Sequence, residues 1–201
     1  VQRRSGFTGA ELWSLGFVAA ILVVQYFSHE SGFSAQWPFV RSMYARGAWW
    51  QLLSAQWVHL GWLHAGVNAA GLAVLLWAFS QLVDARFQAL TLVGGYAGVA
   101  LVLALDSHCD RYAGASGALH GLLAGSALAL LMTPRAQVRG HQASRVVGAG
   151  LLLALAVKLA WQHPVAGAAI EPGWLGFATY YPAHEAGALG GCIAFLLARW
   201  V

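Results

Sequence analysis

Long apolar runs, separated by shorter polar or glycine-rich stretches, make up most of the chain. A helix needs about 20 mostly apolar residues to cross a bilayer, and several runs approach that length. The pattern therefore predicts an all-α polytopic membrane protein, a six-transmembrane-helix bundle that forms a single domain over residues 1–201. The predicted spans cover roughly 10–27, 57–79, 88–105, 115–132, 146–162 and 182–200.

Three stretches between these runs are too long or too mixed to be simple turns. Residues 28–56 contain Pro38, and a group of tryptophans falls in or just after them (Trp37, Trp49, Trp50, Trp57 and Trp62). Because tryptophan is enriched at the headgroup level, we expect this stretch to lie in the membrane interface. Residues 133–145 are polar and basic, and residues 163–181 are rich in glycine, proline and aromatic residues. Further spans follow the first run, which predicts a retained helix and not a cleaved signal peptide.

The composition favours a membrane protein and argues against a nucleic-acid partner. Hydrophobic residues make up 59% of the chain and charged residues only 9%, with a mean hydropathy of +0.62, whereas a soluble domain carries about 25% charge. The 11 Lys and Arg residues behind the net charge of +4 are scattered over segment ends and form no basic stripe. Cys109 falls in a polar loop and Cys192 inside a span, so their depths argue against a disulfide.

The distribution of basic residues predicts the orientation of the spans. Cytoplasmic loops carry an excess of Lys and Arg, which places the N-terminus in the cytoplasm. The second, fourth and sixth spans then all enter the membrane from the outer side. The predicted inner side holds Arg3, Arg4, Arg86, Arg135, Arg139, Arg145 and Arg199, and the outer side holds Arg41, Arg46, Arg111 and Lys158.

A candidate nucleophile stands at the start of the fourth span, in Gly114-Ala115-Ser116-Gly117. A serine in the first turn of a helix has backbone N–H groups around it without intrahelical acceptors, and the helix dipole there favours negative charge. The N–H groups of Ala115 and Ser116 could therefore bind an oxyanion. The alternative is that Ser116 is simply a small residue at a tight helix start.

A candidate general base opens the sixth span. A neutral His184 could accept the serine proton, and Gly187 and Gly191 share its face, so that face can approach a neighbouring helix closely. Glu185 points about 100° away from His184, which favours a Ser-His dyad without a carboxylate. The alternative is an interfacial histidine at a helix end. We expect Asp106, Asp110 and Arg111, in the loop before Ser116, to be solvated.

Further polar side chains lie at the same depth. His64 and Asn68 are one turn apart on one face of the second span, and both can donate to an oxyanion; the alternative is interhelical hydrogen bonding. His120, one turn after Ser116, is expected within about 4–5 Å of the His184 ring or the substrate cleft, with a purely structural contact as the alternative. Gly117, Gly121 and Gly125 predict a packing face.

With these motifs in this order, the sequence resembles the rhomboid family of intramembrane serine proteases over nearly its whole length. The matching residues are His59, His64 and Asn68, then Gly114-x-Ser116-Gly117, then Ala183-His184-x2-Gly187-x3-Gly191. The resemblance implies that Ser116 and His184 form the catalytic dyad and that His64, Asn68 and backbone N–H groups serve the oxyanion. It implies membrane-anchored protein substrates, no cofactor and no metal.

The stretch Gly-Ala-Ser-Gly-Ala-Leu-His-Gly (114–121) is similar to the rhombosortase branch of that family. His120 stands where many rhomboids carry an aromatic residue on the catalytic histidine, and Trp50-Gln51 stands where many carry Trp-Arg. The branch implies substrates with a C-terminal Gly-Gly, an apolar helix and a basic tail, cut near the outer face and passed to water or to an amine. It implies a bacterial inner membrane with the active site toward the periplasm.

Three other functions are compatible with parts of the pattern. A general rhomboid protease would cut other single-span substrates. A haem or metal membrane protein could use His59, His64, His120 and His184, since imidazole binds such metals, but it would need neither the Gly-x-Ser-Gly turn nor Asn68. A non-catalytic rhomboid relative would only bind clients. Labelling by a fluorophosphonate separates a serine protease from the last two.

Overall fold

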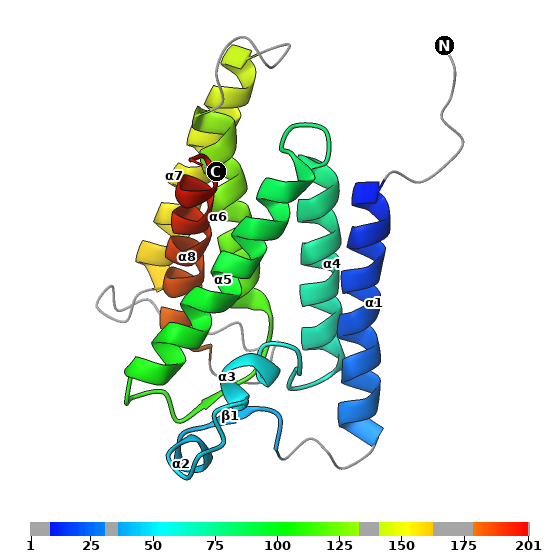
Figure 1. Cartoon of the computed structure of the whole chain (residues 1–201), viewed down its shortest axis with the longest axis vertical. Helices are drawn as coiled ribbons and strands as arrows, with labels where there is room; N and C mark the ends of the chain where they lie inside the picture. The colour runs from blue at the N-terminus through cyan, green and yellow to red at the C-terminus, as the bar shows by residue number, and fades with distance from the viewer. Residues whose placement is uncertain (1–8, 31–35, 133–140, 163–178, 201) are drawn as a thin grey trace.

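The computed structural model describes residues 9–30, 36–132, 141–162 and 179–200. Within these residues the chain is mainly helical, with one two-stranded sheet in which β1 and β2 pair antiparallel. Figure 1 shows the arrangement. The elements are α1 (Gly9–Glu30), β1 (Phe39–Val40), α2 (Arg41–Tyr44), α3 (Gln51–Ser54), α4 (Trp62–Phe79), α5 (Ala85–Leu105), β2 (Arg111–Tyr112), α6 (Ser116–Met132), α7 (His141–Gln162) and α8 (Pro182–Ala198).

Each predicted span falls on one long helix, which agrees with a helical membrane bundle. By length and composition, three described helices are long and apolar enough to cross a bilayer: Trp62–Phe79, Ala85–Leu105 and Ala143–Gln162. Three shorter apolar helices accompany them: Leu15–Ser28, Ser116–Met132 and Pro182–Ala198. The number of six spans therefore stays a prediction.

Three predicted spans begin several residues away from the start of their helix. The fifth was expected from residue 146, but α7 begins at His141. The second was expected from residue 57, but α4 begins at Trp62, because Trp57 packs its ring between Phe17 and Tyr96 at centroid distances of 6.0 and 5.5 Å. The third was expected from residue 88, but α5 begins at Ala85. There the Asp84 carboxylate accepts a hydrogen bond from the Arg86 N–H at 2.8 Å and caps the helix.

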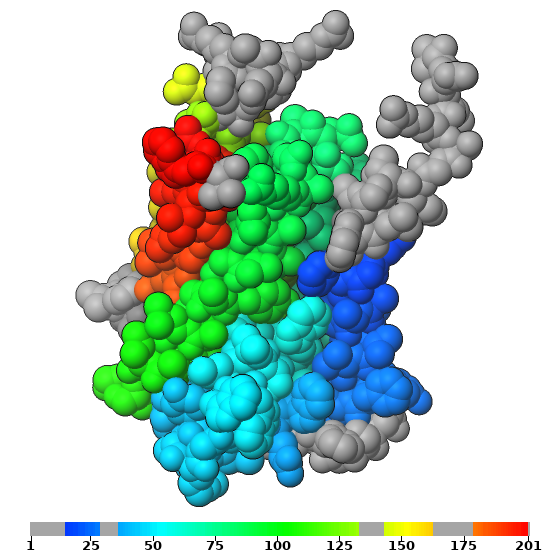
Figure 2. Space-filling view, viewed as in Figure 1, coloured from blue at the N-terminus to red at the C-terminus, as the bar shows by residue number. Residues whose placement is uncertain are grey.

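The described part of the tryptophan-rich stretch, residues 36–56, lies over one end of the bundle and is called the cap below. Its strand β1 pairs with β2, and the Gln51 side chain accepts from the Val40 N–H at 3.0 Å. Arg41 donates to the Leu103 carbonyl at 2.7 Å, which ties the cap to the last turn of α5. Figure 2 shows this segment, in cyan, at one end of the molecule. Trp49 is 70% exposed there, as expected for a segment at the membrane surface.

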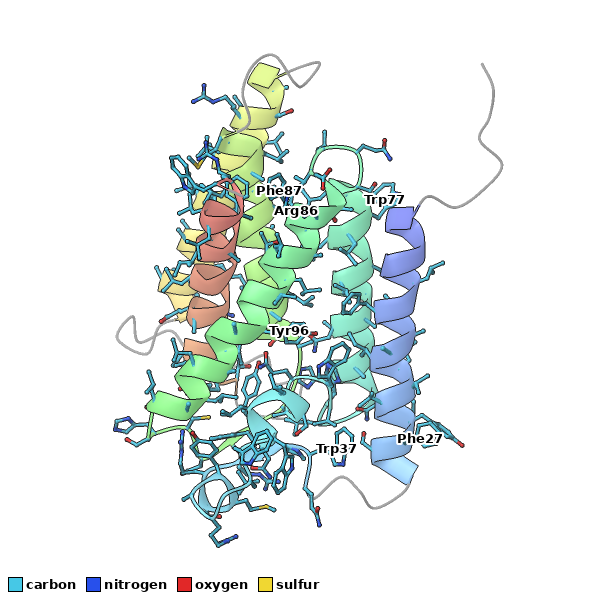
Figure 3. The ribbon with its side chains drawn as sticks, in the orientation of Figure 1. Phe27, Trp37, Trp77, Arg86, Phe87 and Tyr96 are labelled. Carbon is cyan, nitrogen blue, oxygen red and sulfur yellow. The ribbon has the colours of Figure 1, made fainter. Side chains whose placement is uncertain are left out.

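Aromatic side chains also mark the opposite end of the bundle. Figure 3 places Trp77 and Arg86 at the end away from Trp37, and Trp77 is 73% exposed. Such belts at both ends are typical of membrane helices. The predicted basic stretch 133–145 and the glycine-rich stretch 163–181 lie mostly outside the described residues, as do Arg3, Arg4, Arg135 and Arg139.

Helix α8 packs against both α5 and α6, while α7 covers another side of α6 and α1 packs on α4. Most residues of α6 are buried, so α6 is a central helix. Helices α4, α6 and α8 all begin at the end that carries the cap (Figure 1). This shared direction brings their first turns to one level of the bundle.

The α6–α8 contact depends on glycine. A Cβ at Gly187 would overlap the backbone carbonyl of Gly117, and a Cβ at Gly191 would overlap that of Gly121. The predicted glycine face of α6 therefore packs as expected, and it does so against α5 as well, because a Cβ at Gly121 would also meet Gly95. Small residues at such positions let helix backbones approach closely in a membrane.

We expect Gly187→Ala to lower both thermal stability and any activity that depends on the position of His184, one turn away. The new methyl has only backbone to meet, so the two helices must separate, and overpacking of this kind costs about 1–3 kcal/mol. Gly150→Ala on α7 is the matched control, because nothing lies within 4 Å of its Cβ. Thermal unfolding in lipid measures both variants, and equal stability of the two would contradict this account of the α6–α8 contact.

Candidate active site

Ser116 and His184 lie against each other although they are far apart in the sequence. Ser116 is the first residue of α6 and His184 is in the first turn of α8. The Ser116 Oγ and His184 Nε2 atoms are 2.9 Å apart, a hydrogen-bonding distance. His184 is only 6% exposed, and its Nδ1 is buried without a hydrogen-bond partner within the described ranges. No carboxylate therefore orients this ring from the described part of the chain.

A cavity of about 460 Å³ opens onto this pair. It lies at the end of the bundle that carries the cap, and its lining includes no carboxylate from the part of the chain that the structure describes. Its walls bring together candidate residues from three helices and from the loops between them. The lining residues are Pro38, Leu60, His64, Val67, Asn68, Arg111, Tyr112, Ala113, Ser116, Thr179, Tyr180 and His184.

The turn before Ser116 is shaped by a glycine with positive φ. Gly114 has φ +121°, a region that side chains rarely adopt, and a Cβ there would lie 2.6 Å from the His64 ring. Its N–H donates to the Ala55 carbonyl at 2.8 Å. The Ala115 N–H, expected among the oxyanion donors, instead points to His59 Nε2 at 3.4 Å. In this structure that donor faces a side chain, because His59 is packed behind the turn.

His64 and Asn68 form one wall of the cavity from α4. The Leu60 N–H donates weakly, at 3.5 Å, to His64 Nδ1. With Nδ1 as the acceptor of that bond, a neutral His64 would have its proton on Nε2, and that atom would then be a donor. The Asn68 amide donates one of its two N–H groups to the His64 carbonyl at 3.0 Å. The His59 ring meets the His64 ring edge to face at 5.0 Å and holds it in place.

His120 packs under His184, within the distance expected from the sequence. The two rings are nearly parallel, at 13°, with centroids 4.1 Å apart. His120 Nδ1 is 2.6 Å from the carbonyl oxygen of Ser116. The imidazole thus contacts both members of the pair, on the side of Ser116 where α6 continues.

In the loop before Ser116, Asp110 and Arg111 are exposed, as expected for a solvated loop, whereas Asp106 is partly buried and hydrogen-bonded. Asp106 accepts a hydrogen bond from the Tyr180 hydroxyl and another from the His108 N–H at 2.9 Å. These bonds, the Tyr180 bond foremost, lower the pKa of Asp106 to about 2. The carboxylate therefore stays charged at neutral pH and links the end of α5 to Tyr180, which lines the cavity.

Other residues of that loop have different surroundings. Arg111 belongs to β2 and lines the cavity, so it is a cation of the site mouth and not only a solvated charge. Cys109 is 2% exposed, and burial raises the pKa of its thiol to about 11. Because the thiolate is the reactive form, burial makes Cys109 a poor nucleophile at neutral pH.

Four residues near the site were not assigned a role there from the sequence. Tyr112 and Tyr180 line the cavity, and His59 supports the serine turn. Lys158, which the sequence marked only as an outer-side charge, has its Nζ 2.8 Å from His120 Nε2. A lone charge inside an apolar run is a signal that could have identified Lys158. No comparable signal exists for the tyrosines.

Chemically, this arrangement contains what acyl transfer requires. A hydroxyl is bonded to an imidazole that can accept its proton, and side-chain donors face the same cavity. A nucleophile, a base and oxyanion donors within one site are the parts of nucleophilic hydrolysis.

Comparison with known proteins gives one match. The rhomboid domain family model matches residues 46–200, well over half of the chain. Neither a curated protein nor a solved structure matches the chain at a significant level. Members of the matched family are intramembrane serine proteases that act on membrane proteins within the bilayer. The family expected from the motifs is thereby confirmed, and this chain is a membrane protein that belongs to the rhomboid family.

Proposed function

We propose that this protein is an intramembrane serine endopeptidase in which Ser116 is the nucleophile and His184 the general base. The observation that carries the proposal is the 2.9 Å contact between Ser116 Oγ and His184 Nε2 at the wall of a cavity. The absence of a described partner for His184 Nδ1 supports a dyad without a third carboxylate member. The substrates are membrane-anchored proteins.

The reaction begins when Ser116 Oγ attacks the carbonyl carbon of a peptide bond while its proton passes to His184 Nε2. A C–O bond forms and the carbonyl oxygen becomes an oxyanion. Collapse of this intermediate breaks the C–N bond, and His184 returns the proton to the leaving amine. Water or an amine then attacks the resulting acyl-enzyme, and its proton passes to His184. The bond between the acyl carbon and Ser116 Oγ breaks, and His184 returns the proton to Ser116 Oγ.

Donors for the oxyanion come from two helices. The N–H of Ser116 belongs to the first turn of α6, where backbone donors lack intrahelical acceptors. Asn68 and His64 line the same cavity from α4, and both side chains can donate hydrogen bonds. The Ala115 N–H already bonds His59 Nε2 in this structure, so the set that we propose does not include it.

The orientation that we propose places six spans in a bacterial inner membrane, with the N-terminus in the cytoplasm and the cavity toward the periplasm. Helices α4, α6 and α8 begin at the same end of the bundle, the end that carries the cavity. The sequence assigns four basic residues to that side and seven to the opposite side. The excess of basic residues in cytoplasmic loops then orients the chain.

The substrate class that we propose is a protein with a single C-terminal span and a Gly-Gly pair near its outer end, as in rhombosortase substrates. A helix hides its carbonyls from a nucleophile, so the substrate must unwind locally. Each glycine lowers the cost of unwinding by about 1 kcal/mol relative to alanine. The alternative is a general rhomboid protease that cuts other single spans at small residues.

A haem or metal centre is not favoured by the contacts of the histidines. His184 Nε2 is engaged by Ser116, and both ring nitrogens of His120 have partners. Coordination would have to break these contacts. The contacts of these histidines lead to the Ser116 hydroxyl, the Ser116 carbonyl and Lys158, and not to one shared position that a metal ion could occupy.

The test uses a candidate substrate with a C-terminal Gly-Gly tail, co-expressed with the wild-type protein or with Ser116→Ala. We expect a shortened product with the wild type only. Mass spectrometry of its new C-terminus identifies a free carboxyl group or an added amine. Changing the Gly pair to Leu-Leu should block processing. Unchanged processing would refute the Gly-Gly assignment while leaving the protease proposal intact, and processing by Ser116→Ala would refute the protease itself.

A further inference from the structure

A lysine on α7 reaches the residue that supports His184. The Lys158 Nζ lies 2.8 Å from His120 Nε2 and 2.8 Å from the Gln162 Oε1 one turn further along α7. Lys158 itself does not line the cavity. The chain of side-chain contacts from Lys158 to His184 therefore runs through the His120 ring.

The contacts of His120 determine where its proton lies. The Ser116 carbonyl can only accept, so His120 Nδ1, at 2.6 Å, is the donor. The ammonium of Lys158 can only donate, so His120 Nε2 is the acceptor. Both contacts are satisfied together by a neutral His120 whose single proton is on Nδ1. If the proton moved to Nε2, it would face the ammonium, and Nδ1 would face a carbonyl with no proton between them.

The His120 ring in turn faces the His184 ring. The two stack at 4.1 Å and 13°, whereas Tyr181 meets His184 only edge to face at 6.3 Å. The His184 Nδ1 has no hydrogen-bond partner in the described residues. The described residues therefore supply no hydrogen bond that would hold the plane of the base, as the carboxylate does in a Ser-His-Asp triad. The stack with His120 is the contact placed to do this.

The position of Lys158 is otherwise unfavourable. Its neighbours on α7 are apolar and exposed, with Val157 at 58% and Trp161 at 59% exposure, and α7 is apolar and long enough to cross a membrane. A charged side chain within a membrane span is costly, and such residues usually pair with other polar groups. Lys158 satisfies this requirement with Gln162 on its own helix and with His120 on α6.

We propose that Lys158 is a positioning residue: by donating to His120 Nε2 it holds the proton of His120 on Nδ1 and so fixes the ring that supports His184. This inference rests on the proposed dyad. It adds a helix, α7, to those that shape the site, although α7 contributes no side chain to the cavity lining. Loss of the ammonium leaves the His120 ring free to change tautomer or to rotate, and the plane of His184 is then less well defined.

The first test is spectroscopic and does not need activity. In full-length protein labelled with ¹⁵N-histidine and placed in lipid nanodiscs, the His120 signals are assigned by their loss in His120→Phe. We expect Nδ1 to be protonated and Nε2 to be an unprotonated acceptor. Lys158→Met should change this pattern, and Lys158→Arg should preserve it, because a guanidinium also only donates. A wild-type His120 with its proton on Nε2 would overturn the inference, whatever the variants do.

The second test is kinetic. We expect Lys158→Met to lower kcat on the order of 10–100-fold, the scale for a small displacement of a reacting group, with KM almost unchanged, and Lys158→Arg to restore most of the rate. Val157→Met is the matched control at the adjacent exposed position of α7 and should behave as wild type. In a His120→Phe background, Lys158→Met should cause no further loss, because phenylalanine has no tautomer to set.

The outcomes separate this inference from the proposed function. Rates are normalised to the fraction of sites labelled by a fluorophosphonate. If the wild type cleaves and Ser116→Ala does not, but Lys158→Met is as fast as the wild type, the positioning role is refuted and the protease stands. If losses from Lys158→Met and His120→Phe simply add, the two residues act independently and the role is likewise refuted. If the wild type itself is neither labelled nor active, the protease proposal fails, and the ¹⁵N spectrum still decides the state of His120.

Discussion

Replacing Ser116 or His184 with alanine should abolish cleavage of a membrane-anchored substrate while leaving the protein folded. In serine proteases, loss of the nucleophile or the base lowers kcat by up to about 10⁶-fold. The 2.9 Å contact makes the two side chains one functional unit, so the double substitution should be no worse than either single one. Cleavage of a reconstituted substrate, followed by mass spectrometry, measures this effect, and fluorophosphonate labelling reports on Ser116 directly.

Matched controls exist for both substitutions. Ser126 is on the same helix as Ser116, is fully buried, and its Oγ has no partner within the described ranges; Ser126→Ala should cleave normally. The side chain of His108 is 92% exposed, and His108→Ala should also retain activity. Normal cleavage by Ser116→Ala would eliminate the proposed mechanism, while loss in the controls would mean that the assay reports folding.

Removing the proposed oxyanion donors should slow turnover without abolishing it. We expect Asn68→Ala and His64→Ala each to lower kcat by about 10–1000-fold, the range for losing one such donor. Both side chains line the cavity beside Ser116. KM should change little, because the donors act on charge that develops only in the transition state. Steady-state kinetics with active-site titration measures the effect.

A purely structural role for these residues gives a different result. Gln88 is also a buried amide, 4% exposed, and it bonds the Val83 carbonyl away from the cavity. Gln88→Ala should lower thermal stability and leave kcat per folded molecule unchanged. If Asn68→Ala and His64→Ala behave in the same way as Gln88→Ala, they do not stabilise the oxyanion.

The positions of the helices could largely be predicted from the sequence, whereas some of their ends could not. Each apolar run forms a helix because the hydrophobicity that favours burial in lipid or in the bundle is a property of each residue by itself. The start of α4 depended on Trp57, which leaves the run to pack between Phe17 and Tyr96. The cap over the bundle also depended on distant partners, since Arg41 bonds the carbonyl of Leu103.

The sequence by itself determined the rhomboid family, the helical bundle and the set of polar side chains brought to one cavity: Ser116, His184, His64 and Asn68. These polar residues stand out in the sequence because few polar groups are tolerated in apolar runs. They share one level because successive spans alternate in direction, so every second span begins on the same side of the membrane. Only the tertiary structure decided that the Ala115 N–H faces His59, that Asp106 holds Tyr180, and that Lys158 bonds His120. Those contacts join residues 38 to 74 positions apart. They depend on which faces of the helices meet. Close glycine contacts between helices, such as that of Gly187 with Gly117, decide this.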